Sequence, residues 1–317
     1  MGNVRKAFGV DIGGTNVVIG LVTENGDVSD VKKFQTKDFN EYRKLIDALS
    51  VYIKSFKDEC IEGIGIGAPN GNFYKGTIEY PANLPWKGIT PFAAELTEKC
   101  GSKVFLTNDA NAAAIGEMCF GAAKGKKDFI MITLGTGVGS GIVINGNLVL
   151  GSNGMAGELG HTCIIPYGRK HPGTGLRGSL ESYCSANGIV ETAKEFIAKF
   201  QSHSPLKFFE EKDITAKLIY EHALKGDALS LQIFEYTGEL LGKAFANFVM
   251  FSAPSLIVLF GGLSKAGGLI LNPAKKYMEE NLLEVFKNTC SIQLSGLPED
   301  DAAILGAASL VFQNVKN

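Results

Sequence analysis

Residues 7–16 read Ala7-Phe-Gly-Val-Asp-Ile-Gly-Gly-Thr-Asn16, an apolar run that ends in a glycine turn carrying an acid and a hydroxyl. A second apolar run covers residues 17–22, and Asn25-Gly26 follows it. Asn-Gly between two apolar runs is a strong signal for a β-hairpin, and it predicts positive φ at both turn positions. We therefore expect residues 7–28 to form a strand, a glycine turn, a strand and a hairpin turn.

The same order of elements recurs at residues 128–150. Residues 129–132 predict a strand, Leu134-Gly-Thr-Gly-Val-Gly-Ser-Gly141 a glycine turn, and residues 142–144 a second strand before Asn145-Gly146. The order of elements suggests an internal duplication, although few residues are identical between the two copies. Two similar meanders, each with a glycine turn at its first corner, predict two similar lobes.

Helical patterns alternate with these strands. Apolar residues recur at helical spacing from Tyr42 to Phe56, and residues 109–119 are rich in alanine and begin with an acid, as a helix N-terminus favours. Further helices are predicted at residues 229–251, 273–286 and 301–312. The alternation indicates an α/β protein. We expect a small lobe at residues 1–118, completed by a C-terminal helix at 301–317, and a large lobe at 119–300.

Glycine is unusually frequent, at 39 of 317 residues, against an average of about 7%. The chain has no Gly-X-Y period and only 10 prolines, which excludes collagen and low-complexity linkers. The surplus is therefore expected in turns, close backbone approaches and ligand-binding loops.

The charge balance and the cysteines indicate which binding partners and which cellular compartment the protein has. The 31 basic and 33 acidic residues are well mixed, so no electrostatic footprint for nucleic acid or an anionic membrane is present. The six cysteines are scattered singly, which is typical of reduced thiols in a cytoplasmic protein. Two uncharged stretches, residues 129–157 and 244–263, are broken by glycines or by a proline and are interpreted as core rather than as membrane spans.

Glycine turns present converging backbone N–H groups that bind anions such as phosphate. The chain has no P-loop motif, and its Gly-x-Gly-x-x-Gly at residues 173–178 follows His-Pro instead of a strand, so we interpret that match as chance. Each glycine turn alone is more simply a structural hairpin. Both together, with Asp11 and Thr15 in the first and Thr136 in the second, favour a nucleotide site.

Two further segments carry acids, amides and an imidazole. Asn108 and Asp109 stand where a predicted strand meets a helix, the place where α/β proteins bind ligands. Asp109 alone could be a helix N-cap, but a carboxylate there could also orient a hydroxyl for phosphoryl transfer. Glu158, His161 and Glu181 offer the donors and acceptors that a polyhydroxylated substrate requires, although a structural histidine and a solvated helix face are the simpler interpretations of His161 and Glu181.

Taken in order, these segments resemble the ROK family (repressors, unknown reading frames and sugar kinases) of the actin and hexokinase superfold. The resemblance covers almost the whole chain. It rests on GVDIGGTN at 9–16, GAPN at 67–70, NLPW at 83–86, NDANAA at 108–113, LGTGVG at 134–139, GELGH at 157–161, Leu180-Glu181, GGLS at 261–264 and AILGAA at 303–308. It implies two lobes of ribonuclease H-like fold, with ATP and a sugar in the cleft between them.

The activity that the resemblance implies is ATP-dependent phosphorylation of a hexose at the C6 hydroxyl, with glucose the first choice. A kinase for N-acetylglucosamine, N-acetylmannosamine or fructose is the alternative enzyme, and a non-catalytic, sugar-responsive regulator is the alternative class. Regulators of this kind carry an N-terminal helix-turn-helix module, whereas the first predicted strand begins at about residue 7 here, which favours the enzyme. The resemblance is compatible with a homodimer.

By resemblance, Asp109 is the general base that accepts the proton of the sugar hydroxyl, and Asp11 positions Mg²⁺, through water. The remaining implied contacts divide between sugar and ATP. The sugar contacts match Asn83, Asn108, Glu158, His161 and Glu181, the phosphate contacts match Gly13, Gly14, Thr15, Gly135, Thr136 and Gly137, and the nucleoside contacts match Gly261 and Gly262.

One departure from the family concerns a metal. Members usually hold a structural zinc through the histidine that matches His161 and through three cysteines in a Cys-x-Cys-Gly-x-x-Gly-Cys pattern. The matching run is Pro172-Gly-Thr-Gly-Leu-Arg-Gly-Ser179, in which all three thiols are replaced. His171, Cys163 and Cys184 lie nearby without a usual zinc spacing. We predict no zinc and a loop that is held by packing and hydrogen bonds.

Overall fold

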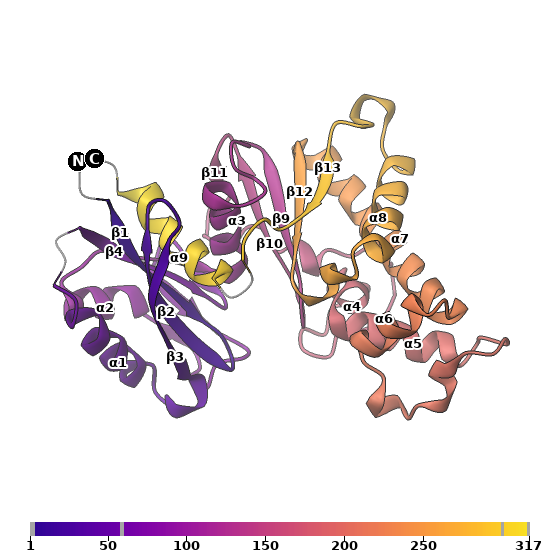
Figure 1. The fold of residues 1–317 in the computed structure, drawn as a ribbon, viewed down its shortest axis with the longest axis horizontal. Coiled ribbons are helices and arrows are strands. Elements are labelled where there is room, and N and C mark those ends of the chain that lie inside the picture. Colours follow the sequence, from indigo (N-terminus) through magenta and orange to yellow (C-terminus); the bar gives the residue numbers. More distant parts are fainter. Residues whose placement is uncertain (1–3, 58–59, 299–300, 316–317) are drawn as a thin grey trace. The chain divides into compact units, whose positions relative to one another are not determined.

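The computed structural model describes residues 4–57, 60–298 and 301–315, and the contacts within it divide the chain into two compact units (Figure 1). The first unit comprises residues 1–127, 141–157 and 295–317, and the second comprises residues 128–140 and 158–294. Strand β10 passes from the second unit to the first between Ser140 and Gly141. The lobe boundaries expected from the sequence stay a prediction.

The first unit is built on a five-stranded sheet of order β3-β2-β1-β4-β8. The strands are β1 (Lys6–Ile12), β2 (Asn16–Thr23), β3 (Val28–Gln35), β4 (Ile61–Ala68) and β8 (Val104–Asn108). Strands β1, β2 and β3 form an antiparallel meander, whereas β4 runs parallel to β1 and β8 runs parallel to β4. The carboxyl ends of β1, β4 and β8 therefore meet at one edge of the sheet, which is where open α/β sheets bind ligands.

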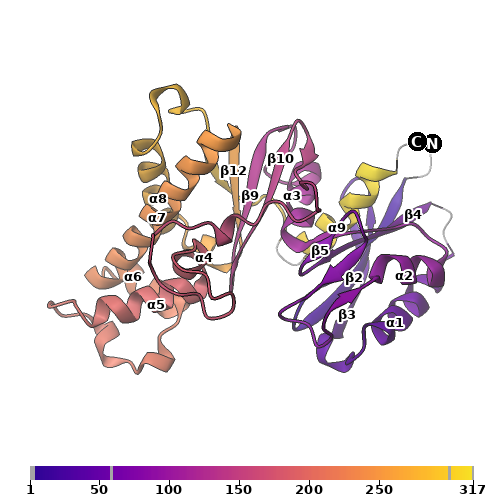
Figure 2. The ribbon, with the colours of Figure 1, turned by 180° about the vertical axis from the view of Figure 1, so that it is seen from behind.

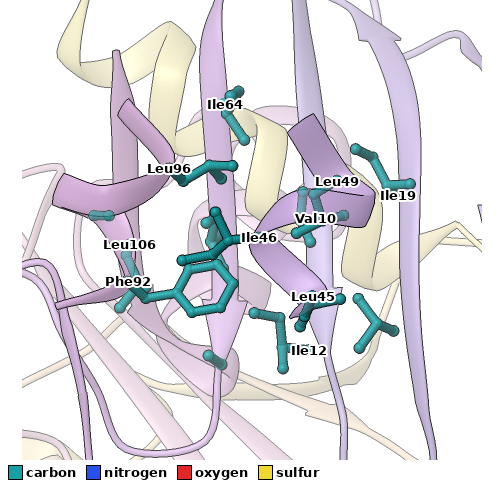
Figure 3. Close-up of a cluster of buried hydrophobic side chains, with 14 of the residues drawn as sticks. Val10, Ile12, Ile19, Leu45, Ile46, Leu49, Ile64, Phe92, Leu96 and Leu106 are labelled. Carbon is teal, nitrogen blue, oxygen red and sulfur yellow. The ribbon is translucent and has the colours of Figure 1, made fainter. Parts of the chain in front are cut away.

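Helices α1 (Tyr42–Lys54) and α2 (Phe92–Cys100) cover one face of this sheet. Figure 3 shows the buried side chains between them and the strands, and it confirms the helix that the apolar spacing after Tyr42 predicts. The labelled residues are Val10, Ile12, Ile19, Ile64 and Leu106 from the strands, Leu45, Ile46 and Leu49 from α1, and Phe92 and Leu96 from α2. A small three-stranded sheet, β5 (Gly71–Asn72), β6 (Thr77–Glu79) and β7 (Ile89–Thr90), follows β4 in the chain.

Helices α3 (Asp109–Phe120) and α9 (Ala302–Asn314) lie on the other face. Two strand glycines allow α9 to approach the sheet. A Cβ on Gly9 would lie 2.1 Å from the carbonyl oxygen of Ile304, and one on Gly65 would lie 1.8 Å from that of Ala307. Part of the glycine surplus thus serves the packing of a helix directly on the backbone of a sheet.

The second sheet repeats the strand order of the first: β11-β10-β9-β12-β13. Its strands are β9 (Phe129–Leu134), β10 (Val138–Ile144), β11 (Asn147–Leu148), β12 (Leu256–Phe260) and β13 (Ser291–Leu294). In chain order, both sheets place the third, second, first, fourth and fifth strands side by side, and β12 and β13 run parallel to β9. The repeated topology confirms the α/β class and the second strand-turn-strand motif that the sequence predicts.

Helices of the second unit are visible in Figure 2 and comprise α4 (Glu181–Cys184), α5 (Ala186–Ile197), α6 (Ala216–Leu224), α7 (Ala228–Ser252) and α8 (Gly268–Glu280). The helix predicted at residues 273–286 is wrong in its bounds, since α8 begins five residues earlier and has Pro273 inside it. Proline is costly there, but its ring packs against α7, where a Cβ on Gly238 would lie 2.4 Å from Pro273 Cγ.

Short 3₁₀ helices complete the chain. They are η1 (Thr36–Asp38), η2 (Leu159–His161), η3 (Pro205–Phe208), η4 (Glu211–Asp213), η5 (Gly262–Ala266) and η6 (Glu284–Phe286). Within the described ranges, no helix is long and apolar enough to cross a membrane, and no disulfide joins the cysteines.

The two Asn-Gly hairpins differ in their turns. Asn145 and Gly146 have φ values of 52° and 75°, as a two-residue type I′ turn requires. In the first hairpin only Gly26 has a positive φ, at 93°, so the expectation for Asn25 is wrong. The reason is a longer loop, because Thr23 N donates to the carbonyl of Asp27 at 2.9 Å and the Thr23 hydroxyl donates to the Asp27 carboxylate.

Candidate active site

Asp11 and Asp109 stand at the ends of β1 and β8, the two strands on either side of β4, at the carboxyl edge of the first sheet. Asp11 is the penultimate residue of β1 and pairs in register with Gly67 of β4, which in turn pairs with Thr107 of β8, and Asp109 follows that strand directly. Burial and the charge of Asp109 raise the pKa of Asp11 to about 7. Burial also raises the pKa of Asp109, against the lowering effect of the Ala110 backbone N–H. The pKa values of both carboxylates are thus raised at this edge of the sheet.

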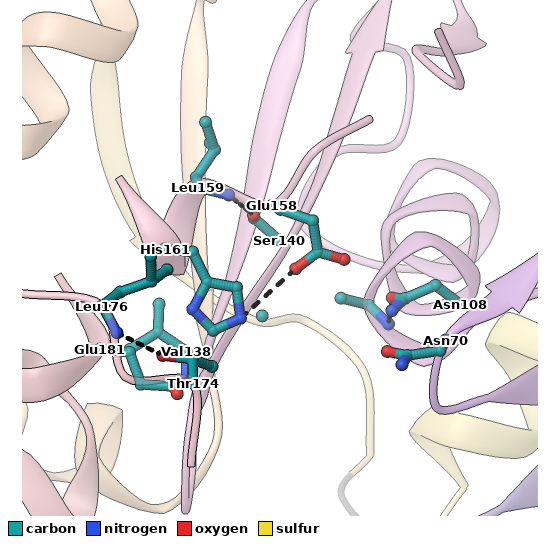
Figure 4. A network of polar contacts seen from close by, with 12 residues as sticks. Asn70, Asn108, Val138, Ser140, Glu158, Leu159, His161, Thr174, Leu176 and Glu181 are labelled. Atoms are coloured by element: carbon teal, nitrogen blue, oxygen red, sulfur yellow. Dashed lines mark hydrogen bonds and ion pairs between the residues drawn. The ribbon is translucent and has the colours of Figure 1, made fainter. Parts of the chain in front are cut away.

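Asn108 is the residue that caps helix α3. Its Oδ1 accepts hydrogen bonds from Ala110 N at 2.8 Å and from Asn111 N at 3.4 Å, while Asp109 is already the first helical residue. The N-cap of α3 is therefore Asn108 and not Asp109. Asp109 lies at the positive end of the helix dipole, which favours a carboxylate. Figure 4 shows Asn108 with Asn70, whose Nδ2 donates to the carbonyl of Tyr80 at 3.2 Å.

The first glycine turn, residues 13–15, is held by Thr36 at the start of η1. The buried Thr36 hydroxyl donates to the carbonyl of Gly13 at 2.6 Å, and Thr36 N donates to that of Thr15 at 3.0 Å. Gly14 also lacks room for a side chain, since a Cβ would lie 2.9 Å from the carbonyl oxygen of Asn83, itself an exposed residue. Because N–H and C=O of a trans peptide point in opposite directions, Gly14 N–H faces away from Thr36.

The second glycine turn, residues 135–137, is held by the start of α5. Ala186 N donates to the carbonyl of Gly135 at 2.8 Å, and the amide of Asn187 donates to that of Thr136 at 3.3 Å. The N–H groups of Thr136 and Gly137 consequently face away from α5. Both turns therefore have carbonyl groups bound on one side and N–H groups presented on the other, as anion-binding turns do.

Gly261 and Gly262 follow β12 in the same unit as the second turn. Gly261 has a φ of 101°, and a Cβ there would lie 2.6 Å from the carbonyl oxygen of Leu134. Ser264 Oγ donates to the Gly261 carbonyl at 2.7 Å. Gly262 has open space where a Cβ would stand. Gly261 is therefore required by the fold, whereas Gly262 leaves room beside the turn.

His161 ends η2, which packs on strand β10. Leu159 N donates to Ser140 Oγ at 3.0 Å, and a Cβ on Gly160 would lie 2.0 Å from the carbonyl oxygen of Val138. His161 Nε2 lies 3.9 Å from a carboxylate oxygen of Glu158 (Figure 4). Its Nδ1 is buried and has no hydrogen-bond partner among the described residues.

Glu181 is the first residue of α4 and has both carboxylate oxygens engaged. Oε2 accepts from Val138 N at 2.7 Å, and Oε1 lies 2.9 Å from His171 Nε2. A Cβ on Gly137 would lie 2.4 Å from Oε2. Glu181 therefore links the second glycine turn to the loop that carries His171.

Glu181, His171 and the second glycine turn line a cavity of about 630 Å³ in the second unit, a volume typical of small-ligand sites. Its walls come from the second turn, the loop before α4, the first three turns of α5 and the region of η4, and they include Thr136, His171, Glu181, Asn187, Glu191, Lys194 and Lys212. The sequence predictions included Thr136 and Glu181 but missed Asn187, as they missed Thr36 in the first unit. Both anchors are distant in sequence from the turns they hold, so spacing alone carries no signal for them.

The residues around His161 do not fit the structural zinc that the resemblance implies. Pro172, Thr174 and Ser179 stand at the cysteine positions, and zinc sites require thiolate, imidazole or carboxylate ligands. Across the described part of the chain, no group of three or more such residues could hold a metal ion. Gly173–Gly178, the chance Gly-x-Gly-x-x-Gly match, lies in a loop that isolated bridges close, one between Cys163 and Ser179 and one between Lys170 and Arg177.

Comparison with known proteins gives full-length matches. A family model described as "ROK family" matches residues 7–314. The glucokinase of Halalkalibacterium halodurans is 36% identical over 319 residues, covering 98% of this chain and 96% of the relative. That of Thermotoga maritima is 33% identical, covering 98% of both chains. The crystal structure of a ROK family glucokinase from Streptomyces griseus in complex with glucose and AMPPNP is 30% identical, with a TM-score of 0.75 over 98% of this chain and all of that one.

Proposed function

The chain belongs to the ROK family, and from that premise we propose that it is a glucokinase, which transfers the γ-phosphoryl group of ATP to the C6 hydroxyl of glucose. Relatives that are 33% and 36% identical over nearly the whole chain and are named glucokinase support this substrate. The observation that carries the chemistry is the position of the Asp109 carboxylate, at the first residue of α3 and at the carboxyl edge of the first sheet.

Asp109 acts as the general base in this proposal. Its pKa is raised by burial, and a carboxylate with a raised pKa is a stronger proton acceptor. Phosphoryl transfer to an alcohol asks for a group that orients the hydroxyl and takes its proton as the bond to phosphorus forms. Because α3 begins at Asp109 and Asn108 caps it, the carboxylate is fixed by the helix start.

The two glycine turns bind the phosphates of ATP in this proposal. Their carbonyl groups are held by Thr36 and by the start of α5, which leaves the N–H groups of Gly14, Thr136 and Gly137 directed away from those anchors. The remaining turn residues, Gly13, Thr15 and Gly135, complete the same loops. Gly261 and Gly262 approach the nucleoside.

Mg²⁺ fits the donors at the first sheet edge. Carboxylate oxygen is the ligand that Mg²⁺ prefers. Burial, with the charge of Asp109, raises the pKa of Asp11, and a bound cation would oppose both effects. Asp11 would hold the ion, through water. When bound, the ion supplies positive charge against the phosphate oxygens.

The hexose contacts in this proposal follow the resemblance, and they are Asn83, Asn108, Glu158, His161 and Glu181. We also propose a cytoplasmic location, small-molecule partners without nucleic acid or membrane, and a homodimer as the assembly to test. The mixed charges of the sequence support the absence of a nucleic-acid partner.

A coupled ADP-release assay with glucose, N-acetylglucosamine, N-acetylmannosamine, mannose and fructose tests the substrate. Glucose is expected to have the highest kcat/KM, by about tenfold or more, since pocket contacts discriminate sugars by such factors. A higher kcat/KM for an N-acetylated sugar or for fructose would make that sugar the substrate in place of glucose. If no sugar stimulates ADP release, the proposal of a kinase is refuted. Asp109→Asn is the control for background ATP hydrolysis.

A further inference from the structure

Backbone hydrogen bonds close the loop before α4, in which the cysteine ligands expected from the resemblance are replaced. Residues 162–180 form a narrow antiparallel loop without a metal: Ile164 N donates to the Gly178 carbonyl at 2.8 Å, and Gly178 N donates to the Arg169 carbonyl at 2.9 Å. At the loop tip, His171 N donates to the Leu176 carbonyl at 2.8 Å, and Gly175 N donates to the His171 carbonyl at 2.9 Å. His171 is thus the residue at which the tip closes.

The imidazole of His171 adds two bonds that its backbone does not make. Thr174 N lies 3.0 Å from His171 Nδ1 and donates to it. A ring nitrogen that accepts a backbone N–H carries a lone pair, so the ring proton lies on Nε2. Nε2 is 2.9 Å from Glu181 Oε1 and donates that proton. One ring therefore joins the loop tip to Glu181.

Glu181 is confined from a second side. Its Oε2 accepts from Val138 N, the residue after the second glycine turn. Gly137 allows this approach because it has no Cβ. The side chains of His171 and Glu181 are only 20% and 14% exposed, so water competes weakly for the bond between them.

We infer that His171 is a positioning residue, which orients the Glu181 carboxylate for the hexose in place of the metal-held loop of the family. The inference rests on the proposed function for the identity of the sugar, and on the geometry above for the residue. A hydrogen bond to a carboxylate from a fixed ring restricts both the rotation and the reach of that carboxylate. Removing the donor frees Glu181 to adopt other rotamers before sugar binds.

Two substitutions separate the two bonds of the ring. His171→Asn places an amide oxygen near the position of Nδ1, so it can still accept from Thr174 N–H, but no atom reaches Glu181. His171→Gln places an amide N–H near the position of Nε2 and keeps the donor to Glu181. His203→Asn, at an exposed histidine outside this loop, is the matched control for the substitution itself.

His171→Asn is expected to raise the KM for glucose about tenfold, with a smaller change in kcat and in the KM for ATP, because a hydrogen bond to a charged group is lost. His171→Gln should restore the KM to within about threefold of the wild type. A merely structural role would instead lower the melting temperature and the amount of active enzyme at constant KM. Unchanged glucose KM in His171→Asn, or no rescue by His171→Gln, would overturn the inference.

Two measurements keep this test separate from that of the proposed function. Glucose affinity is measured by calorimetry without ATP, so a wild type that binds glucose but transfers no phosphate refutes the kinase while His171→Asn still tests the positioning. A wild type that binds no hexose overturns both. Elemental analysis of the purified protein is expected to find no zinc, and about one zinc per chain would show that a metal holds the loop instead.

Discussion

The turn after β1 and the turn after β9 occupy the same place in sheets of the same strand order, but different acids and anchors surround them. The first lies beside Asp11 on its own strand and is held by Thr36, which follows the meander directly. The second is followed by Val138, whose N–H binds Glu181, and is held by α5, about 50 residues further along the chain.

In the proposed kinase, the two copies of this backbone pattern would serve different tasks. The first unit brings carboxylates with raised pKa values to a strand edge, which suits proton and metal chemistry. In the second unit the carboxylate is bound by a backbone N–H and an imidazole, which suits the orientation of a substrate. Substitution of the acids in the first unit should therefore change kcat, whereas substitution of Glu181 in the second should change the KM for glucose.

The strongest test compares Asp109→Asn with Glu181→Gln. Asp109→Asn is expected to reduce kcat by about 10²–10⁴, the usual contribution of a general base, while glucose binding by calorimetry is retained. Glu181→Gln should raise the glucose KM with a smaller loss of kcat. Equal losses of kcat in both variants, from steady-state assays, would contradict the division between the two units.

The next comparison uses the glycines of the two turns. Gly14→Ala and Gly137→Ala each introduce a Cβ within 3 Å of a neighbouring atom, the Asn83 carbonyl oxygen and Glu181 Oε2 respectively. Each should lower kcat/KM by about 10–100-fold, because small displacements at a reacting centre are costly. Gly135→Ala meets no atom within 4 Å, so it is the stability control and should melt with the wild type in calorimetry. A lowered melting temperature for Gly135→Ala would show that the turn tolerates no side chain at all.

The anchors of the turns should differ in strength. Thr36→Val removes a hydroxyl from a fully buried residue that binds the Gly13 carbonyl at 2.6 Å, which should cost about 1–3 kcal/mol and raise the KM for ATP. Asn187→Ala removes an exposed bond of 3.3 Å, which should cost about 0.5–1 kcal/mol. Thermal unfolding and ATP titration of both variants measure the contrast, and the reverse order would mean that α5 is the firmer anchor.

The smallest expected effect is a pH dependence confined to the first unit. The pKa of Asp11 is about 7 in the folded chain and about 3.9 in an unfolded one. The folded state therefore binds this proton more tightly, and the stability that Asp11 contributes declines as pH rises from about 4 through 7. Relative to wild type without Mg²⁺, Asp11→Asn should gain a few degrees in melting temperature from about pH 5 to about pH 8. A constant difference between the two proteins would rule out titration of Asp11 in this range.

Local signals in the sequence predict the parts of the site that depend on neighbours in the chain. Asp109 could be placed at a strand-to-helix junction because β8 and α3 are adjacent in sequence. The second hairpin could be predicted because Asn-Gly favours one two-residue turn. These features are decided within a few residues, so pattern and propensity suffice for them.

Features that depend on distant packing escaped prediction. Nothing in the sequence around Thr36 and Asn187 indicates that their side chains bind the two glycine turns. The bounds of α8 likewise depend on the packing of Pro273 against Gly238. His171 could be noted near the altered zinc loop, but its bond to Glu181 depends on the conformation of the whole loop. Where local propensities allow more than one conformation, contacts with distant residues decide which of them forms.

The glycine contacts beneath α9 have a consequence for how the protein is made. Gly9 and Gly65 lie early in the chain, yet the helix that covers them, α9, is the last of the described helices. On the ribosome, the face of the first sheet that carries α3 and α9 stays without α9 until the second unit has been synthesised. The second unit lies between segments of the first, so it can complete its folding earlier.

A circular permutant would test this order of assembly. Arg5 donates to the carbonyl of Val315 at 2.9 Å, so a short linker could join these neighbouring segments, with new ends in an exposed loop of the second unit. In that order α9 precedes β1 during synthesis, and nascent chains should resist protease earlier than those of the natural order. The contact between Gly9 and Ile304 spans about 300 residues of sequence. It can therefore form only when almost the whole chain has been synthesised.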